Sequence, residues 1–513
     1  MKPQESDMDE ASAPVRAQYH HFVPQFILKN FAHKYVPPKG KNQGRPPRKP
    51  GQKLFKGDPA LNHVDLTADK PEITESPVKR ILGMPDMYRD TTKPAKQQQM
   101  VEEMFSRLES DVSLIYRRIT NAFDKGDDGL WLTRDERNLI RKFGFLMKYR
   151  GSTFHRRFYH EAGADYEAND RHILLEYMKQ HGFSRPLDVW FHNIKCVIEV
   201  DMDNDLEWLS ELPKKMYPDD ARWAIMTIQS MFMSICATPS QECEFVLTDN
   251  SYSIYEGPTN VGVDQRTGEL VDMGWVNFHE FAPISPRLMI VLRSFLLPDA
   301  LEDADPKIKG WRDDYRQKAV DDVFGKGARS MLYDLDIRKP DNNYTTTIDG
   351  RQYHISSEDG TLRSSHKFFF PFFRISERHV HIINGIFFDN ASHCTSLVFN
   401  TRNSFLGTLE FYMESATLFN KTATSIPGDR RLILLKKLAV LMTSMGSTKI
   451  PIWPEVQPAG FSSPTRLMET WDVWVKIFSS KLEALKDDSP TEFNQIRRLL
   501  GKQAQIPDPE RRR

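Results

Sequence analysis

The strongest constraint on the fold is a long stretch in which apolar residues recur every three or four positions. It runs from Met100 to Phe123, and its apolar positions are Met100, Met104, Leu108, Val112, Ile115 and Ile119. This spacing places an apolar stripe along one face of an α-helix. A second helix is expected to begin at Thr133, whose hydroxyl can cap the first turn while Glu136 completes a capping box. We expect these two helices to pack as an antiparallel hairpin.

The rest of the chain divides into helical and strand patterns. The helical patterns cover Arg171–His181, Pro186–Val200, Arg222–Cys236, His379–Asn400, Arg430–Met445 and Arg466–Asp487. Short β-rich runs cover His63–Leu66, Glu244–Thr248 and Leu288–Leu292, and Asp264–Gly268 is typical of a hairpin tip. The sequence therefore predicts an α+β protein, predominantly helical, with one small antiparallel sheet.

Length and composition limit the class of protein. The 513 residues are 39% hydrophobic and 27% charged, as in globular proteins, and Lys plus Arg equals Asp plus Glu at 70 each. No net charge therefore draws the chain to nucleic acid or anionic lipid. No run reaches the roughly 18 to 20 apolar residues that span a bilayer, and residues 1–18 lack the apolar stretch of a secretory signal. We expect a soluble, cytoplasmic or nuclear protein that does not bind membranes.

We expect the following organisation along the chain. Residues 1–18 form a disordered tail, and 19–295 form the main domain with the helical hairpin and the sheet. Within it, 36–52 is a flexible loop, because Pro and Gly interrupt both regular structures there. A charged insertion covers 296–378, and helices in 379–505 complete the core. A frayed tail covers 506–513.

A segment near the amino end combines two imidazoles with a rigid Val-Pro step. Residues 19–32 are Tyr-His-His-Phe-Val-Pro-Gln-Phe-Ile-Leu-Lys-Asn-Phe-Ala, followed in order by Met87-Tyr88, Glu109, Lys148-Tyr149-Arg150, Thr248-Asp249-Asn250 and Pro283-Ile284-Ser285-Pro286. Over about residues 19 to 410 this order resembles the domain-of-unknown-function family 4238 (DUF 4238), although Ser251 stands where the family usually has Pro. The resemblance implies which positions matter, and it implies no reaction.

The His pair has a catalytic and a structural interpretation. Adjacent residues of an extended backbone point to opposite sides, so His20 and His21 are not expected to share a metal. A His followed at the third position by Pro also opens a metal-dependent nuclease signature, with Asn62-His63 as a loosely spaced continuation. The favoured interpretation is structural: one His donates to a backbone carbonyl and fixes the amino-terminal segment to the core.

Charged residues further along the chain could complete a site. Glu109 lies at the edge of an apolar helix face and Arg150 ends the neighbouring helix, so we expect a buried or half-buried ion pair. Asp249 and Asn250 follow a strand, where both functional side chains and Asx-turns are common. If a His, Glu109, Arg150 and Asp249 converge, they form a polar pocket in which carboxylates orient the His or hold Mg²⁺.

Other chemical signals are weaker. His155 and His160 have a poor helical spacing for chelation, and the sequence contains no dinucleotide, phosphate-loop, nucleophile-elbow or zincin motif. A local group of cations at Lys39, Lys41, Arg45, Arg48, Lys49 and Lys53 could contact nucleic-acid phosphates, although such runs are usually solvated.

Two functional classes follow. The first is a hydrolase, with a nuclease as its specific case, in which His20, His21, Asp249 and Glu109 are catalytic. Gln25, Asn30, Arg150 and Asn250 would bind the substrate, Mg²⁺ or another divalent metal could assist, and the 39–53 loop would hold nucleic acid. The second is a non-catalytic binding or sensing protein in which the same polar residues are structural.

Overall fold

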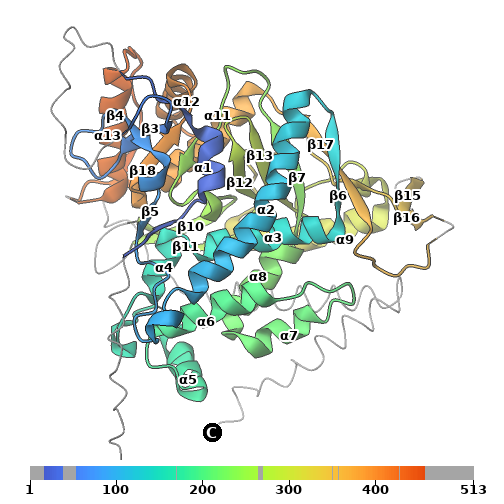
Figure 1. The fold of residues 1–513 in the computed structure, drawn as a ribbon. Coiled ribbons are helices and arrows are strands. Elements are labelled where there is room, and N and C mark those ends of the chain that lie inside the picture. The colour runs from blue at the N-terminus through green and yellow to red at the C-terminus, as the bar shows by residue number, and fades with distance from the viewer. Residues whose placement is uncertain are drawn as a thin grey trace, which may run out of the picture.

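The computed structural model describes residues 17–37, 54–168, 170–263, 270–348, 351–355, 358–426 and 428–456. The predicted basic loop, the tip of the expected hairpin at 264–268, the expected helix at 466–487 and both tails lie at least partly outside this range. Figure 1 shows the described elements as they follow one another along the chain.

A seven-stranded mixed sheet forms the centre of the molecule (Figure 1). Its strands are β6 (Gly129–Thr133), β7 (Met231–Ala237), β9 (Tyr255–Glu256), β12 (His279–Ser285), β13 (Leu288–Ser294), β14 (Asp341–Asn342) and β17 (Lys367–Arg374). The path runs β14-β17-β7-β13-β12-β9, and β6 also pairs with β17. The pairing of β17 with β7 is parallel and the others are antiparallel.

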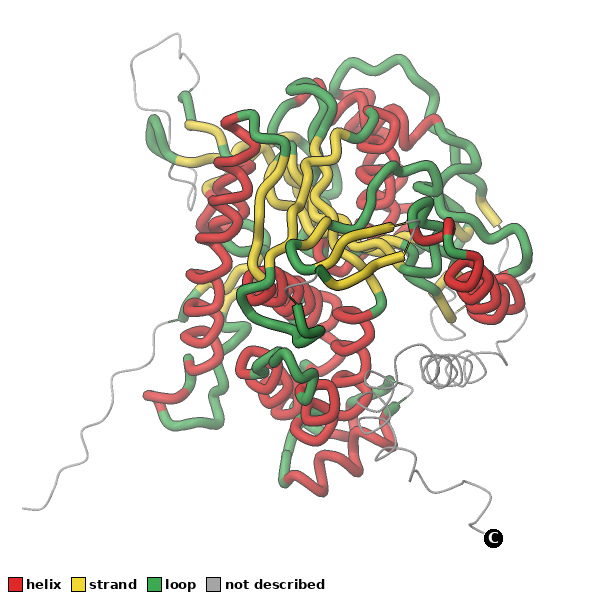
Figure 2. The backbone as a smooth tube through the Cα atoms, turned by 90° about the vertical axis from the view of Figure 1, so that its right-hand side faces the viewer, coloured by secondary structure: helices red, strands yellow, loops and turns green. Residues whose placement is uncertain are grey.

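Both faces of this sheet are covered. Successive side chains of a strand point to opposite faces, and in these strands the side chains on each face are mostly apolar, so each face packs against its own core cluster. In β7, Met233 and Ile235 enter one core cluster and Cys236 enters another. The first cluster includes side chains of α1 (Gln25–Phe31), α2 (Met100–Lys125), α3 (Arg134–Tyr149), α6 (Pro186–Glu199) and α8 (Pro218–Gln229). The second includes side chains of α11 (Glu377–Asp389), α12 (Arg402–Glu414) and α13 (Arg430–Ser444). Figure 2 shows the strands between helices on either side.

A second sheet joins distant parts of the chain. It has five strands, which are β2 (His33–Lys34), β3 (Pro59–Asp65), β4 (Ile73–Pro77), β8 (Leu247–Thr248) and β18 (Ser396–Phe399). Four two-stranded sheets pair β1 (Tyr19–His21) with β5 (Gly83–Pro85), β10 (Thr259–Val263) with β11 (Leu270–Trp275), β15 (Thr345–Ile348) with β16 (Arg351–His354), and β19 (Ala423–Thr424) with β20 (Glu455–Val456). The other α-helices of the described residues are α4 (Ser152–Phe158), α5 (Arg171–His181), α7 (Trp208–Lys215), α9 (Pro306–Arg316) and α10 (Asp322–Phe324).

The predicted fold class, α+β with one small antiparallel sheet, is wrong in its sheet content. Strands that are buried on both faces lose the alternation of apolar and polar residues by which a strand is normally recognised. The strands also pair across long separations: Phe372 lies opposite Ile235, and Phe399 lies opposite Asn62. Nothing local in the sequence indicates such partners.

The local predictions were more accurate than the global one. The helix expected from Met100 is α2, and Thr133 and Glu136 form the expected capping box at the start of α3. The helix expected over Arg222–Cys236 is wrong in its second half, where the chain enters β7. The helix expected over His379–Asn400 likewise ends at Asp389, and its last part is β18. Among the described residues, no helix has both the length and the apolar character that a membrane crossing needs.

A buried ion pair connects α3 to the central sheet. The Nζ of Lys148 lies 2.6 Å from Oε1 of Glu280 in β12, and the two side chains are only 7% and 4% exposed. Asn277 donates a further hydrogen bond to Glu280 at 2.6 Å. Because neither charge is well solvated, each depends on the other for compensation.

We therefore predict that Lys148→Met lowers the free energy of unfolding by about 3–5 kcal/mol, since it leaves the Glu280 carboxylate buried without a cation. Lys148→Met combined with Glu280→Met should recover most of this loss, because no lone charge remains. Denaturant titration of the three proteins measures both effects. A single variant as stable as the wild type would show that the pair is not a structural link.

Candidate polar site at the amino-terminal segment

His20 is buried with one ring nitrogen unused. It lies in β1, where it pairs with Met84 of β5, and its side chain is 2% exposed. The backbone N–H of Tyr88 donates to its Nδ1 at 3.0 Å, and the two rings stack with centroids 5.1 Å apart. Since Nδ1 accepts, the proton of the neutral ring is on Nε2, and this buried atom has no partner in the described chain.

His21 has the structural contact that the sequence suggested. Its Nδ1 lies 3.0 Å from the carbonyl oxygen of Ile81 and must be the donor, because a carbonyl only accepts. The expectation that one His of the pair fixes the amino-terminal segment through a backbone carbonyl is confirmed. The ring of His21 also meets that of Tyr19 edge to face, with centroids 5.1 Å apart.

Both imidazoles are held in the neutral form. Burial lowers the pKa of His20 to about 4, with Arg150 acting in the same direction and Asp86 opposing it. Burial also lowers the pKa of His21, against the hydrogen bond to Ile81. At neutral pH neither side chain therefore contributes a positive charge.

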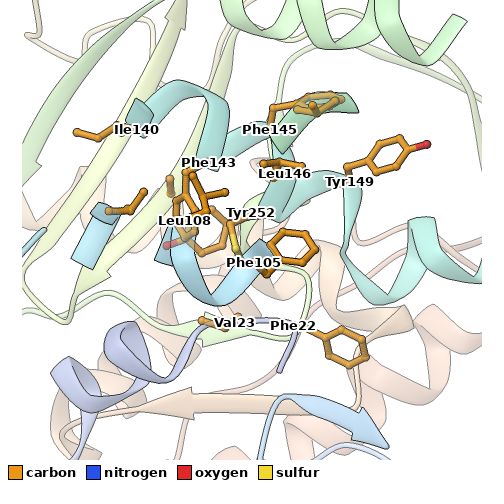
Figure 3. Close-up of a cluster of buried hydrophobic side chains, with 14 of the residues drawn as sticks. Phe22, Val23, Phe105, Leu108, Ile140, Phe143, Phe145, Leu146, Tyr149 and Tyr252 are labelled. Carbon is orange, nitrogen blue, oxygen red and sulfur yellow. The ribbon is translucent and has the colours of Figure 1, made fainter. Parts of the chain in front are cut away.

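The predicted ion pair of Glu109 and Arg150 is confirmed. Nη1 of Arg150 donates to Oε1 of Glu109 at 2.7 Å, and Nε donates to the backbone oxygen of Phe22 at 3.3 Å. The guanidinium also lies 4.7 Å from the centroid of the Phe105 ring. Figure 3 shows Phe105 of α2 and the Phe22-Val23 segment within the same buried cluster. The third nitrogen, Nη2, is buried, and in the described chain the hydroxyl of Tyr88 is the remaining group that interacts with this guanidinium.

Glu102 joins this group and was missed by the sequence analysis. Burial raises the pKa of Glu102 to about 7, helped by the charge of Glu109 and opposed by Arg150. Both carboxyl groups belong to α2, and a separation of seven residues, about two turns, places them on one helix face. That spacing could have indicated a pair, but a half-buried Glu is not distinguishable in sequence from a solvated one.

The group continues into a line of stacked rings. The hydroxyl of Tyr88 is buried beside the guanidinium of Arg150, which opposes the rise that burial causes in the pKa of Tyr88. The Tyr88 ring stacks on Trp190 with centroids 5.9 Å apart. The ring of His155 meets Trp190 at 4.8 Å, and burial lowers the pKa of His155 to about 4. His155 Nε2 and Ser152 Oγ, three residues apart on α4, are also buried without partners. Buried polar atoms nearly always have partners, so such atoms mark a place for water or a ligand.

Asp249 makes its hydrogen bonds to Thr395, next to β18, and not to the group of His20, Glu109 and Arg150. It is 3% exposed, and the backbone N–H of Thr395 donates to its two oxygens at 3.1 and 3.0 Å. Burial raises its pKa despite these hydrogen bonds. Its charge reaches Tyr19, whose pKa is raised mainly by burial and further by Asp249. A catalytic role for Asp249 stays a prediction, since its closest contacts fasten it to the strand region of β18.

The predicted binding residues are also spread out. Asn250 Nδ2 donates to the backbone oxygen of Asn390 at 3.1 Å, and its Oδ1 accepts from Thr248 at 2.6 Å. Asn30 donates to the backbone oxygen of Ile284 at 2.8 Å, and Gln25 is half-buried at the start of α1. Of the proposed set, the structure brings His20, His21, Glu109 and Arg150 together.

The predicted metal has no ready ligand set in the described chain, where no three His, Cys, Asp or Glu side chains are grouped as a metal site requires. The loosely spaced Asn62-His63 step lies in β3. There Asn62 donates to the backbone oxygen of Asn400 at 2.6 Å, and His63 lies 3.3 Å from the hydroxyls of Ser76 and Ser396. These residues join β3 to β4 and β18.

Comparison with known proteins gives a family and no activity. The family model described as "Protein of unknown function (DUF4238)" matches residues 19–403, which include every residue of the polar site. No curated protein and no solved structure matches the chain.

The ion pair makes a prediction about stability. Glu109→Ala should lower the melting temperature by several degrees, because the buried guanidinium of Arg150 loses its carboxylate. Asp111→Ala, an exposed acid two residues later on α2, is the matched control and should melt like the wild type. An unchanged melt for Glu109→Ala would reject a stabilising role for the pair.

A second prediction concerns pH. The pKa of His20 in the folded protein, about 4, lies below its ordinary value of 6.5. Its contribution to stability is therefore present above pH 6.5 and is lost as the pH falls through 4. His20→Asn should lose stability less steeply than the wild type between these values. The exposed His172→Asn serves as control, and unfolding titrations at several pH values give the slopes. Parallel curves for His20→Asn and the wild type would contradict the prediction.

Proposed function

The chain belongs to the DUF4238 family, and for this member we propose a hydrolase activity at the polar site of His20, Tyr88, Glu102, Glu109 and Arg150. The observation that supports it is the juxtaposition of unused hydrogen-bonding atoms with a carboxyl group whose pKa is near neutral. Nε2 of His20 is buried without a partner in the described chain, while the hydroxyl of Tyr88 and Nη2 of Arg150 are buried with no partner outside the pair that Tyr88 and Arg150 themselves form. A general acid–base works best when its pKa is close to the working pH, and Glu102 meets that condition.

Each side chain has a role in the proposed reaction. In its ionised form Glu102 takes a proton from a water molecule, whose oxygen forms a bond to the electrophilic atom of the substrate. Nη2 of Arg150 and the hydroxyl of Tyr88 donate to the oxygen on which negative charge develops. The bond to the leaving oxygen then breaks, and Glu102 returns its proton to that oxygen. One water molecule is consumed and two hydroxyl products form, so atoms and protons balance.

Glu109 and His20 support this group. Glu109 keeps the guanidinium of Arg150 in place and, by its negative charge, helps to raise the pKa of Glu102. His20 is neutral at working pH and directs its unpartnered Nε2 hydrogen to the bound water or substrate. The predicted catalytic role of His21 is compatible with this arrangement, since its Nδ1 is occupied by Ile81 while its Nε2 is left with a lone pair.

The substrate class we propose is an ester, with the phosphodiester of a nucleic acid as the specific case. The nuclease hypothesis came from the Pro at the third position after His21 and from the cations of the 39–53 loop, which lies outside the described residues. The substrates to be screened are therefore RNA, DNA and bis(4-nitrophenyl) phosphate, each with and without Mg²⁺, Mn²⁺ or Zn²⁺. Hydrolysis of any of them by the purified chain gives the activity on which variants are compared.

We predict that Glu102→Gln lowers the rate by about 10²- to 10⁴-fold, the usual contribution of a general acid–base, without lowering the melting temperature. In the wild type kcat/KM should rise with pH and level off above about 7, because ionised Glu102 is the base. The variant should lose this dependence. Glu103→Gln, an exposed neighbour on α2, is the control and should keep full activity.

The opposite pattern would support the non-catalytic alternative. In that case no substrate is turned over under any metal condition, and His20→Asn and Arg150→Lys lower only the melting temperature. An active protein whose rate and pH profile survive Glu102→Gln would also reject the proposed base.

A further inference from the structure

A group of arginines at the other end of α3 has no counter-charge in the described chain. Arg134, Arg137 and Arg141 are three and four residues apart, so they lie on one face of the helix. None of the three is within ion-pair distance of a described carboxylate, although many other arginines are, Arg150, Arg157 and Arg185 among them. Three adjacent cations without an acid are unusual, because like charges repel and exposed arginine is easily paired.

The contacts of these side chains fix them without neutralising them. Nε of Arg134 donates to the backbone oxygen of Arg363 at 3.1 Å, and its Nη2 lies 3.4 Å from Nδ1 of His366. The guanidinium of Arg137 lies 4.2 Å from the centroid of the Phe368 ring. Nη2 of Arg141 donates to the backbone oxygen of Met231. Nη2 of Arg137 also donates to Oδ1 of Asn138 at 3.0 Å. Backbone oxygens, rings and this amide hold the guanidinium planes in place, but they supply no negative charge.

Two donors of this group are buried and unused. Nε of Arg137 and Nε of Arg141 make no hydrogen bond within the described chain, and each residue as a whole is half-buried. Burial and the charges of Arg141 and Arg134 lower the pKa of Arg137 to about 9, and burial alone lowers that of Arg141 to about 10. Both remain cations at neutral pH, in surroundings that disfavour their charge.

We propose that Arg137 and Arg141, flanked by Arg134, bind a phosphate group. A guanidinium presents Nε and Nη in a plane that matches two oxygens of one anion. In both arginines Nε is unused, while Nη2 donates to a neutral acceptor, Oδ1 of Asn138 for Arg137 and the backbone oxygen of Met231 for Arg141. Three uncompensated cations suit a dianion better than a single carboxylate. The phosphate could belong to a free nucleotide or to the backbone of a nucleic acid. The inference does not rest on the proposed hydrolase activity, because it concerns binding at a different part of α3.

The test is binding of inorganic phosphate, measured by calorimetric titration and by thermal melting against chloride at equal ionic strength. Phosphate should raise the melting temperature of the wild type, because a ligand that binds the folded state stabilises it. Arg137→Gln and Arg141→Gln should each weaken binding by about tenfold or more, the usual effect of losing a charged hydrogen bond. Arg117→Gln, an exposed arginine on α2, is the control and should bind phosphate like the wild type.

A second readout separates a binding role from a structural one. Without phosphate, Arg137→Gln should melt at or above the wild-type temperature, since the variant relieves repulsion among the three cations. A structural arginine would give a lower melt and an unchanged response to phosphate. If a variant fails to fold, titration of the wild type and of Arg137→Lys, which keeps the charge but not the planar edge, still decides between a binding and a structural role.

Titration with a 5′-mononucleotide and with a short single-stranded oligonucleotide distinguishes the two sources of the phosphate. No binding of phosphate, nucleotide or oligonucleotide by the wild type would overturn the proposal.

Discussion

The buried guanidinium of Arg150 is the interaction on which the amino-terminal part of the structure depends. It bonds the backbone of Phe22, the carboxylate of Glu109 and, through its face, the ring of Phe105. One cation thus connects the segment after β1, helix α2 and the end of α3. A buried charge costs several kcal/mol in lost solvation, so it persists only where such contacts return most of that cost. The same position leaves Nη2 without a hydrogen bond of good geometry, so this donor is available to a ligand.

The sequence predicted what depends on neighbouring residues and failed where distant residues meet. The periodicity from Met100 and the Thr133 capping box describe interactions within one or two helical turns, so they were correct. The sheets depend on pairs such as Phe372 with Ile235, separated by more than a hundred residues. In β7 the side chains on both faces are apolar, so the strand has the composition of a buried helix. Pattern alone cannot separate those two cases.

In the candidate site too, the sequence predicted what local patterns indicate and missed what depends on the packing of distant residues. The pairing of Glu109 with Arg150 could be predicted because each ends or borders a helix with an apolar face. Glu102 could not, because its raised pKa comes from burial and from Glu109, which only the packed structure supplies. Asp249 follows a strand and looks functional in sequence, yet both its oxygens accept from the backbone of Thr395. A strand end is equally suited to a catalytic group and to a turn or clasp, and the sequence does not distinguish them.

The two arginine environments on α3 call for different ligands. At Arg150 the charge is already balanced by Glu109, so a ligand needs only an acceptor for Nη2 and a polar group near His20. At Arg137 and Arg141 no described acid balances the charge, so a ligand must bring its own negative charge. Nine residues separate Arg141 from Arg150, which corresponds to roughly 14 Å along the helix and to half a turn beyond two full turns. The two guanidinium groups therefore point to opposite faces of α3. A small ligand bound at one cannot contact the other, and the two sites can be occupied independently.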